Sequence, residues 1–136
     1  MDQFLTVNCS PATLKTEIDE PYSTFYFAEE NSKPLGFVKL RTQPIPEELT
    51  NEQVIEIERL YVLTSHHGKK IGAQLMSHCI QLAQNSGCNY IWLAVWEHNQ
   101  KAIHFYEKWG FEKFGAKIFV LGTDEQTDFM MKKKLD

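Results

Sequence analysis

A glycine-containing turn in the middle of the chain has residue types that could bind phosphate. Residues 67–73 read HGKKIGA and lie between a strand-like segment and a helix-like segment. The first backbone N–H groups of a helix have no partner within it, and the helix dipole adds positive charge at that end. Such a turn can hold a phosphate, and Lys69 and Lys70 would add to the attraction. The turn matches neither the P-loop nor the dinucleotide-binding pattern, and an ordinary helix start fits it as well.

A second segment with polar and aromatic residues lies at 99–111 and reads NQKAIHFYEKWGF. Asn99 can cap a helix, and Gly110 can end it. An amphipathic helix of this kind places its apolar residues against a core, and Tyr106 fits it as one more core aromatic residue. Helical packing alone therefore accounts for the apolar residues of the segment.

Two glutamates, Glu56 and Glu58, lie close together in a strand-like segment. Alternation along the strand places five side chains on one face, namely Val54, Glu56, Glu58, Leu60 and Val62. Partial burial and mutual repulsion would raise the pKa of one carboxyl toward the range of a general base. Two ordinary glutamates on a solvated strand face fit the pattern equally well.

Hydrophobic periodicity predicts the elements that would position these groups. The expected order is α-β-β-β-α-β-α-β-β, an α/β fold with a mixed sheet and helices packed against it. The single domain, residues 1–136, is expected to contain helices at 10–20, 71–84 and 99–109 and strands at 22–29, 35–42, 54–63, 90–96, 112–121 and 127–134. The strand at 90–96 is almost continuously apolar, which is typical of burial on both faces.

The two motifs together resemble the GNAT N-acetyltransferase superfamily. That family has a Q/R-x-x-G-x-G/A turn after its fourth strand and, further on, an N-x-x-A-x-x-F-Y-x-x-x-G-F segment. This chain has residues 67–72 at the first motif and 99–111 at the second. His67 stands where Gln or Arg is usual, and Lys70 stands where the first glycine is usual.

Residues 91–97 and 124–128 are similar to the PaiA-like branch of the superfamily, whose members acetylate polyamines. The resemblance implies a GNAT-type mixed, mostly antiparallel sheet flanked by helices. The family begins with a strand and usually two helices, whereas the segment before Tyr22 has room for one helix. We therefore expect the chain to lack the family's first strand and first helix. The acceptor site is then open, or a second subunit covers it, or the chain is a shortened form of the family.

The resemblance also implies that acetyl-CoA is the cosubstrate. The strand before the turn is expected to bind the pantetheine arm and the thioester, through the backbone of Leu60, Tyr61 and Val62. The turn is expected to bind the pyrophosphate, through His67, Gly68, Lys69, Lys70, Ile71, Gly72 and Ala73. Asn99 is expected either to bind the pantetheine arm or to keep the two strands apart. Lys108 is expected to bind the 3′-phosphate of the cofactor.

Acetyl transfer to an amine by direct attack follows from the same resemblance. An amine with a pKa of ~10 is mostly protonated at neutral pH, so a base must take its proton. We expect Glu56 to be that base because of its offset from the glycine turn, and Glu58 is the close second. Tyr106 stands at the family's position for the acid, where a phenol with a pKa of ~10 can protonate a leaving thiolate with a pKa of ~8.5.

The overall composition is that of a mildly acidic globular protein. The formal net charge is -4 and the apolar fraction is 43%, so the chain lacks the basic surface of a nucleic-acid-binding protein. No apolar run approaches the ~20 residues of a membrane helix. The N-terminus has no basic region typical of a signal peptide, and the three cysteines have no CxxC spacing. We expect a cytoplasmic protein with reduced thiols and no metal site.

The expected function is acetyl transfer to a primary amine of a small molecule such as a polyamine, which the acidic residues near the third strand could attract. A non-catalytic acyl-CoA-binding module and a protein or peptide N-acetyltransferase are the alternatives. A homodimer is also open, because Phe119 and Phe129 in the last strands fit either an interface or a core.

Overall fold

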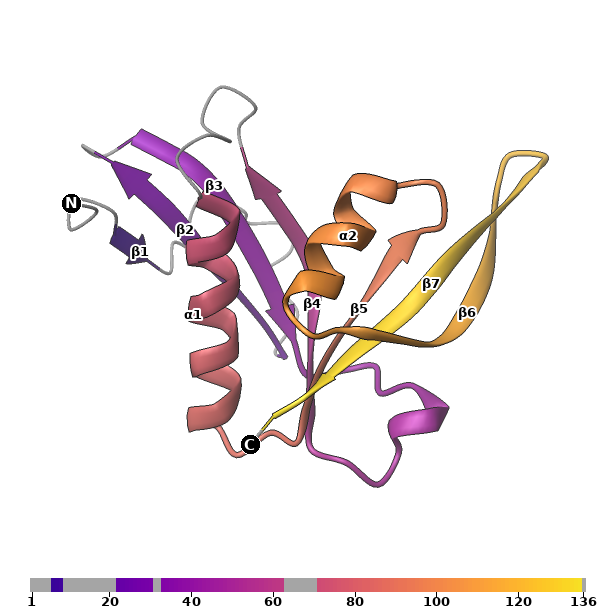
Figure 1. Cartoon of the computed structure of the whole chain (residues 1–136), viewed down its shortest axis with the longest axis horizontal. Coiled ribbons are helices and arrows are strands. Elements are labelled where there is room, and N and C mark those ends of the chain that lie inside the picture. The colour runs from indigo at the N-terminus through magenta and orange to yellow at the C-terminus, as the bar shows by residue number, and fades with distance from the viewer. Residues whose placement is uncertain (1–5, 9–21, 31–32, 63–70, 136) are drawn as a thin grey trace.

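The computed structural model describes residues 6–8, 22–30, 33–62 and 71–135. Their strands form one seven-stranded sheet in the order β1-β2-β3-β4-β5-β7-β6, with β4 and β5 parallel and the other neighbours antiparallel (Figure 1). The elements are β1 (Thr6–Asn8), β2 (Ser23–Glu30), β3 (Lys33–Arg41), the short 3-10 helix η2 (Glu47–Leu49), β4 (Val54–Val62), α1 (Ile71–Asn85), β5 (Tyr90–Trp96), α2 (Gln100–Lys108), β6 (Glu112–Leu121) and β7 (Asp124–Lys134). The expected mixed, mostly antiparallel sheet with flanking helices is confirmed.

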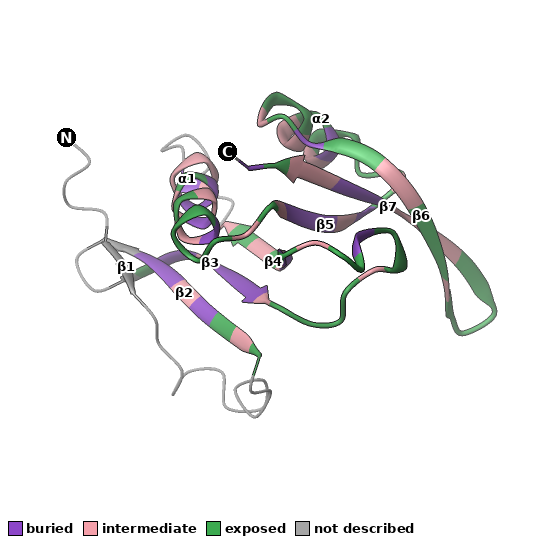
Figure 2. Cartoon of the chain, turned by 90° about the horizontal axis from the view of Figure 1, so that it is seen from below, coloured by how far each residue is buried: buried purple, intermediate pink, exposed green. Residues whose placement is uncertain are grey.

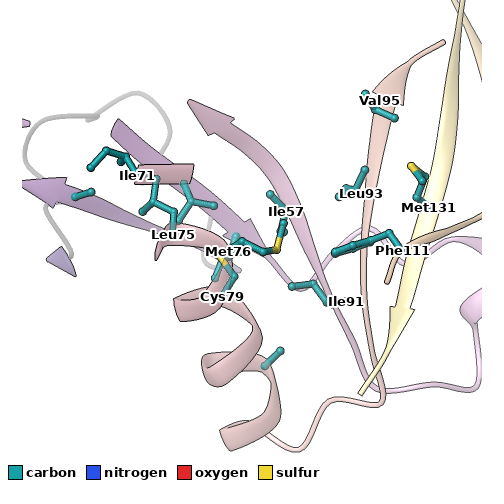
Figure 3. Packing of buried hydrophobic residues seen from close by; sticks show 14 of the residues in the cluster. Ile57, Ile71, Leu75, Met76, Cys79, Ile91, Leu93, Val95, Phe111 and Met131 are labelled. Atoms are coloured by element: carbon teal, nitrogen blue, oxygen red, sulfur yellow. The ribbon is translucent and has the colours of Figure 1, made fainter. Parts of the chain in front are cut away.

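Both α-helices pack on the same face of the sheet (Figure 2). Helix α1 turns one apolar stripe toward the strands, and its buried residues are Ile71, Leu75, Met76, Cys79 and Ala83. Figure 3 shows Met76 and Cys79 facing this core near Ile91 of β5, with Leu93 further along the same strand near Phe111 and Met131. Burial of this apolar surface is the main free-energy term that fixes α1 on the sheet.

A smaller apolar cluster lies on the other face of the sheet. Trp92 alternates in β5 with Ile91 and Leu93, which belong to the helix-side core, so its side chain points away from the helices. Trp92 packs with Leu49 of η2 and with Met130 of β7. The connection between β3 and β4 is therefore anchored across the face that the helices leave uncovered.

At two strands the structure differs from the sequence prediction by more than a shift of one or two residues. Strand β1 pairs antiparallel with β2, so the expectation that the first strand is missing is wrong; a strand of 3 residues is too short to show a period of two. Strand β7 begins at Asp124, because Gly122, with a φ of 65°, allows a tight turn and the polar residues that follow pair with β6. The helix expected at 10–20 lies outside the described residues.

Gly36 of β3 lies directly against the backbone of β4, where it pairs with Val62. A Cβ at this position would lie 2.5 Å from the backbone oxygen of Tyr61, and a backbone atom cannot move aside without shifting its strand. We expect Gly36→Ala to lower the free energy of unfolding by about 2 kcal/mol, as overpacking does. Urea unfolding would measure the change.

Gly72→Ala is the matched control for this substitution. Its nearest neighbours, side-chain atoms of Phe105 and Val62, lie 3.6 Å or more from an added Cβ. The position is helical, so alanine should leave the free energy of unfolding equal or higher. If Gly36→Ala unfolds at the same urea concentration as the wild type, the close approach is contradicted.

Candidate active site

The sheet opens on one side of β4. Within the described part of the two strands, the parallel ladder between β4 and β5 ends at Ile57. On the other side of β4 the register shifts at the same point, because Lys39 pairs with Arg59 and Leu40 pairs with Ile57. Glu58 is therefore the extra residue of a β-bulge, which bends a strand and increases its twist.

The bulge changes the faces to which the side chains of β4 point. Before the bulge, Ile57 lies in the helix-side core and Glu56 points to the opposite face. After the bulge, Leu60 and Val62 pack on the helix side. The prediction that Glu56, Glu58, Leu60 and Val62 share one face is therefore wrong, because a simple period of two does not account for the extra residue.

A cavity of about 450 Å³ lies beyond the point where the two strands separate. Its lining comes from β4, the first described turn of α1, and α2 with its N-cap, and consists of Leu60, Val62, Gly72, Ala73, Asn99, Lys101, Ala102, Phe105 and Tyr106. Most of these side chains are apolar, which suits an aliphatic or extended ligand. Gly72 and Ala73, in the first described turn of α1, lie at the same cavity.

Several residues that the sequence singles out meet in this cavity, namely Leu60, Val62, Gly72, Ala73, Asn99 and Tyr106. Ile71 is buried in the core instead, and the side chain of Tyr61 is 51% exposed and contacts the ring of Phe37. Lys108 is exposed and is not among the lining residues. The other residues of the predicted pyrophosphate turn, His67, Gly68, Lys69 and Lys70, lie outside the described residues.

Three lining residues were not predicted from the sequence. Lys101, Ala102 and Phe105 come from the first turns of α2. Ala102 and Phe105 occupy fixed positions of the N-x-x-A-x-x-F-Y motif, so the motif itself carries the signal that could have identified them. Lys101 has no such signal in the sequence.

Asn99 fixes the beginning of α2. Its side-chain oxygen accepts a hydrogen bond from the backbone N–H of Ala102 at 3.2 Å. This N-cap satisfies one of the unpaired donors at the helix start. Asn99 therefore holds the first turn of α2 against the cavity.

Tyr106 lies in the wall of the cavity, within an aromatic group. Its ring centroid is 5.5 Å from that of Phe105 and 5.8 Å from that of Phe111. Burial raises the pKa of the Tyr106 hydroxyl to about 12, and the nearby Cys79 thiol adds to the shift. The hydroxyl therefore remains protonated at neutral pH, as a proton donor must.

Glu56 and Glu58 lie on the face opposite the helices, where Arg41 of β3 joins them. The Nε atom of Arg41 is 2.6 Å from Glu56 Oε1, and its Nη1 atom is 3.3 Å from Glu58 Oε2. Glu56 is 3% exposed, and burial raises the pKa of its carboxyl although the hydrogen bond from Arg41 opposes the shift. Glu56 thus combines burial with a raised pKa at the point where the sheet opens.

Comparison with known proteins places this geometry in a family. The family model described as the acetyltransferase (GNAT) family matches residues 2–111. The chain belongs to this family. The predicted GNAT resemblance, the GNAT fold and the class of enzyme, an N-acetyltransferase, are confirmed, and members of the family use acetyl-CoA as acyl donor. The PaiA-like branch stays a prediction.

Similar proteins support the GNAT assignment over nearly the whole chain. A relative from Lactobacillus delbrueckii subsp. lactis, named an uncharacterized N-acetyltransferase, is 36% identical over 135 residues, which cover 99% of this chain and 78% of the relative. A streptothricin acetyltransferase from Streptomyces lavendulae is 41% identical over 59 residues, which cover 43% of this chain and 31% of the relative. A GNAT acetyltransferase from Elizabethkingia anophelis, solved with acetyl-CoA bound, has a TM-score of 0.75 at 18% identity and covers 98% of this chain and 99% of its own.

Proposed function

We propose that this GNAT protein transfers the acetyl group of acetyl-CoA to a primary amine of a small molecule such as a polyamine. The observation that carries the proposal is the cavity beside the separated strands, with Tyr106 in its wall and the first turn of α1 at its edge. The apolar lining suits a pantetheine arm, and a helix N-terminus suits a pyrophosphate. The acetyl-CoA in the similar Elizabethkingia structure supports the choice of acyl donor.

In the proposed reaction the amine attacks the thioester carbonyl directly. Acetyl-CoA supplies the acetyl group as a thioester. Glu56 accepts the proton of the ammonium, directly or through a water molecule. Backbone N–H groups of β4 near Leu60 and Tyr61 stabilise the negative charge on the carbonyl oxygen. Tyr106 donates a proton to the departing thiolate, so the C–N bond forms as the C–S bond breaks.

The two substrates approach the opening in the sheet from opposite faces in this proposal. The cavity that would hold the acyl donor lies on the helix side, where Leu60 and Val62 pack. Glu56 lies on the other face, in register with Trp92. An amine entering from that face would reach a base and a thioester at the same opening, which is the arrangement that direct attack requires.

A cationic acceptor is supported by the acidic connection between β3 and β4. Glu47, Glu48 and Glu52 lie in this connection, and the first two are exposed. Their charge would attract a polyamine. Glu56 and Glu58 add less to this attraction than the sequence suggests, because cations of β3 pair with them.

Release of free thiol from acetyl-CoA tests the proposal. The acceptor panel contains putrescine and spermidine as polyamines, streptothricin because of the named relative, and a peptide with a free N-terminus and a lysine. We expect thiol release with a polyamine, above the rate without acceptor. Acetyl-CoA binding without thiol release for any acceptor would contradict the proposal and favour a binding module, and release with the peptide alone would replace the small-molecule acceptor.

Gly72→Leu tests whether the cavity holds the acyl donor. The leucine side chain would extend toward Phe105 and Val62 and fill part of the cavity. We expect calorimetric titration with acetyl-CoA to show binding that is weaker by about tenfold or more, equivalent to 1.4 kcal/mol. Gly72→Ala, which adds one methyl group at ordinary contact distance, should bind almost as the wild type does. Equal binding by Gly72→Leu and Gly72→Ala would place the acyl donor elsewhere.

A cytoplasmic location and a homodimer complete the proposal. Cys79 and Cys88 are free thiols in the structure, which suits a reducing compartment. Within the described ranges, neither α1 nor α2 is both long and apolar enough to cross a membrane. The exposed apolar residues of β6, Ile118 and Val120, support a contact between two copies better than the half-buried aromatic residues of the last strands.

A further inference from the structure

A buried lysine holds the bulged residue of β4. Lys39 of β3 is 2% exposed. Its Nζ atom lies 2.7 Å from Glu58 Oε1 and 5.4 Å from the centroid of the Phe25 ring. Burying an ammonium group is costly unless an opposite charge lies beside it, and the ion pair with Glu58 supplies such a charge.

Glu58 is held from two sides. Lys39 binds one of its carboxylate oxygens, and Arg41 lies 3.3 Å from the other. The two cations lie two positions apart on the same face of β3, and the register shift of the bulge falls between Lys39 and Leu40. They therefore bind the residue of β4 that the ladder with β3 skips, between Ile57 and Arg59.

The bulge lies at the point where β4 leaves β5. The parallel ladder ends at Ile57 in the described strands, directly before the bulged residue. Leu60 and Val62, directly after the bulge, line the cavity. Because a bulge sets the bend and twist of its strand, a change in its shape moves these two residues relative to α2.

We propose that Lys39 is a positioning residue for acetyl transfer, which binds Glu58 and thereby fixes the β4 bulge and the opening in which acetyl-CoA is held. This inference rests on the proposed function. Lys39 is not among the residues that line the cavity, so it acts through Glu58. The inference assigns Glu58 to the geometry of the strand and leaves Glu56 as the proton acceptor.

Lys39→Met tests the positioning role, because methionine keeps a long apolar side chain and removes the ammonium group. Calorimetric titration with acetyl-CoA in the absence of an amine reports on the cavity and does not depend on any base. We expect binding weaker by about tenfold, together with a lower kcat. Lys39→Arg, which keeps the charge and the reach to Glu58, should recover most of both.

Lys113→Met is the matched control. Lys113 lies in β6, and its Nζ atom is 3.9 Å from the centroid of the Phe129 ring. The substitution removes the same ammonium group and a similar cation–aromatic contact, but it lies away from β4. Acetyl-CoA binding and kcat should therefore match those of the wild type.

A double variant distinguishes a positioning role of Lys39 from the destabilisation that an unpaired Glu58 carboxylate would cause. In Lys39→Met, the carboxylate of Glu58 loses an ion-pair partner; in Lys39→Met with Glu58→Gln, that carboxylate is also neutralised. If Lys39 acts by fixing the bulge, the double variant binds acetyl-CoA as weakly as the single one. Recovery of wild-type binding in the double variant would overturn the positioning role.

The remaining outcomes are also decisive. A folded Lys39→Met protein with wild-type affinity and kcat would overturn the inference while leaving the proposed function intact. A wild-type protein that does not bind acetyl-CoA would overturn both. If Lys39→Met does not fold, Glu58→Gln replaces it, because glutamine keeps the shape of the bulged residue; weaker acetyl-CoA binding is again expected, and unchanged binding overturns the inference.

Discussion

Replacing Tyr106 with phenylalanine is expected to lower kcat about 100- to 1,000-fold and to leave acetyl-CoA binding almost unchanged. Phenylalanine keeps the ring that packs against Phe105 and Phe111, so the cavity wall stays in place. The variant removes only the hydroxyl that would protonate the leaving thiolate. Steady-state rates of thiol release, with calorimetric titration of acetyl-CoA, would separate the loss of chemistry from a loss of binding.

Tyr90→Phe is the control for the loss of a hydroxyl. Tyr90 lies at the beginning of β5, at the opposite end of the strand from the opening, with the Nζ atom of Lys132 4.9 Å from its ring centroid. Phenylalanine preserves that contact, so kcat should match the wild type. If Tyr106→Phe keeps a wild-type kcat, the tyrosine is a packing residue and another group supplies the proton.

Replacing Glu56 with glutamine is expected to lower kcat/KM for the amine about 100-fold at neutral pH. Glutamine has the size of glutamate, and its amide oxygen can still accept the hydrogen bond from Arg41 that the structure shows at 2.6 Å. The variant therefore retains the local packing and loses the capacity to accept a proton. Acetyl-CoA binding should change little, because Glu56 lies on the face opposite the cavity.

The pH dependence of kcat/KM in the wild type also tests whether Glu56 is the base. A carboxyl group accepts a proton only when it is ionised, so activity is lost as the pH falls through the pKa of Glu56. Burial raises that pKa above the ordinary value of 4.5, so the loss should begin at a higher pH than for an exposed glutamate. A pH profile of kcat/KM should show this acidic limb in the wild type and not in Glu56→Gln.

Glu58→Gln distinguishes the two candidate bases. Its acidic limb should remain, because Glu56 is intact, while its affinity for acetyl-CoA falls for the reason given for Lys39. If the acidic limb of the pH profile persists in Glu56→Gln and disappears in Glu58→Gln, the base is Glu58 and not Glu56.

The helices and the long strands could be predicted because their patterns are local. The spacing of Ile71, Leu75 and Cys79 places them on one side of a helix, and the apolar run of β5 matches a strand covered on both faces. Strand β1 and the first residues of β7 could not be predicted in this way. Strand β1 forms by pairing with β2, which is distant in sequence. The first residues of β7 form by pairing with β6 through a tight turn.

The residues of the candidate site could be predicted where they belong to one of the two sequence motifs. Tyr106 and Asn99 follow from the second motif, and Gly72 follows from the first. The bulge at Glu58 has no local signature, because an extra residue is extra only with respect to β3. A prediction from strict alternation therefore assigns Leu60 and Val62 to the wrong face of the sheet. The contacts of Lys39 and Arg41 with Glu58 become visible only when β3 and β4 are paired in the structure.

The position of η2 has a consequence for how such enzymes diversify. Leu49 anchors this short helix to Trp92 and Met130 on the face that α1 and α2 do not cover. In the proposed reaction the sheet is therefore a partition, with the acyl donor on one side and the β3–β4 connection on the other. If the acceptor enters on that side, as proposed, substitutions or insertions in the connection would alter the choice of acceptor without disturbing the donor side, and new acceptors could arise in few evolutionary steps.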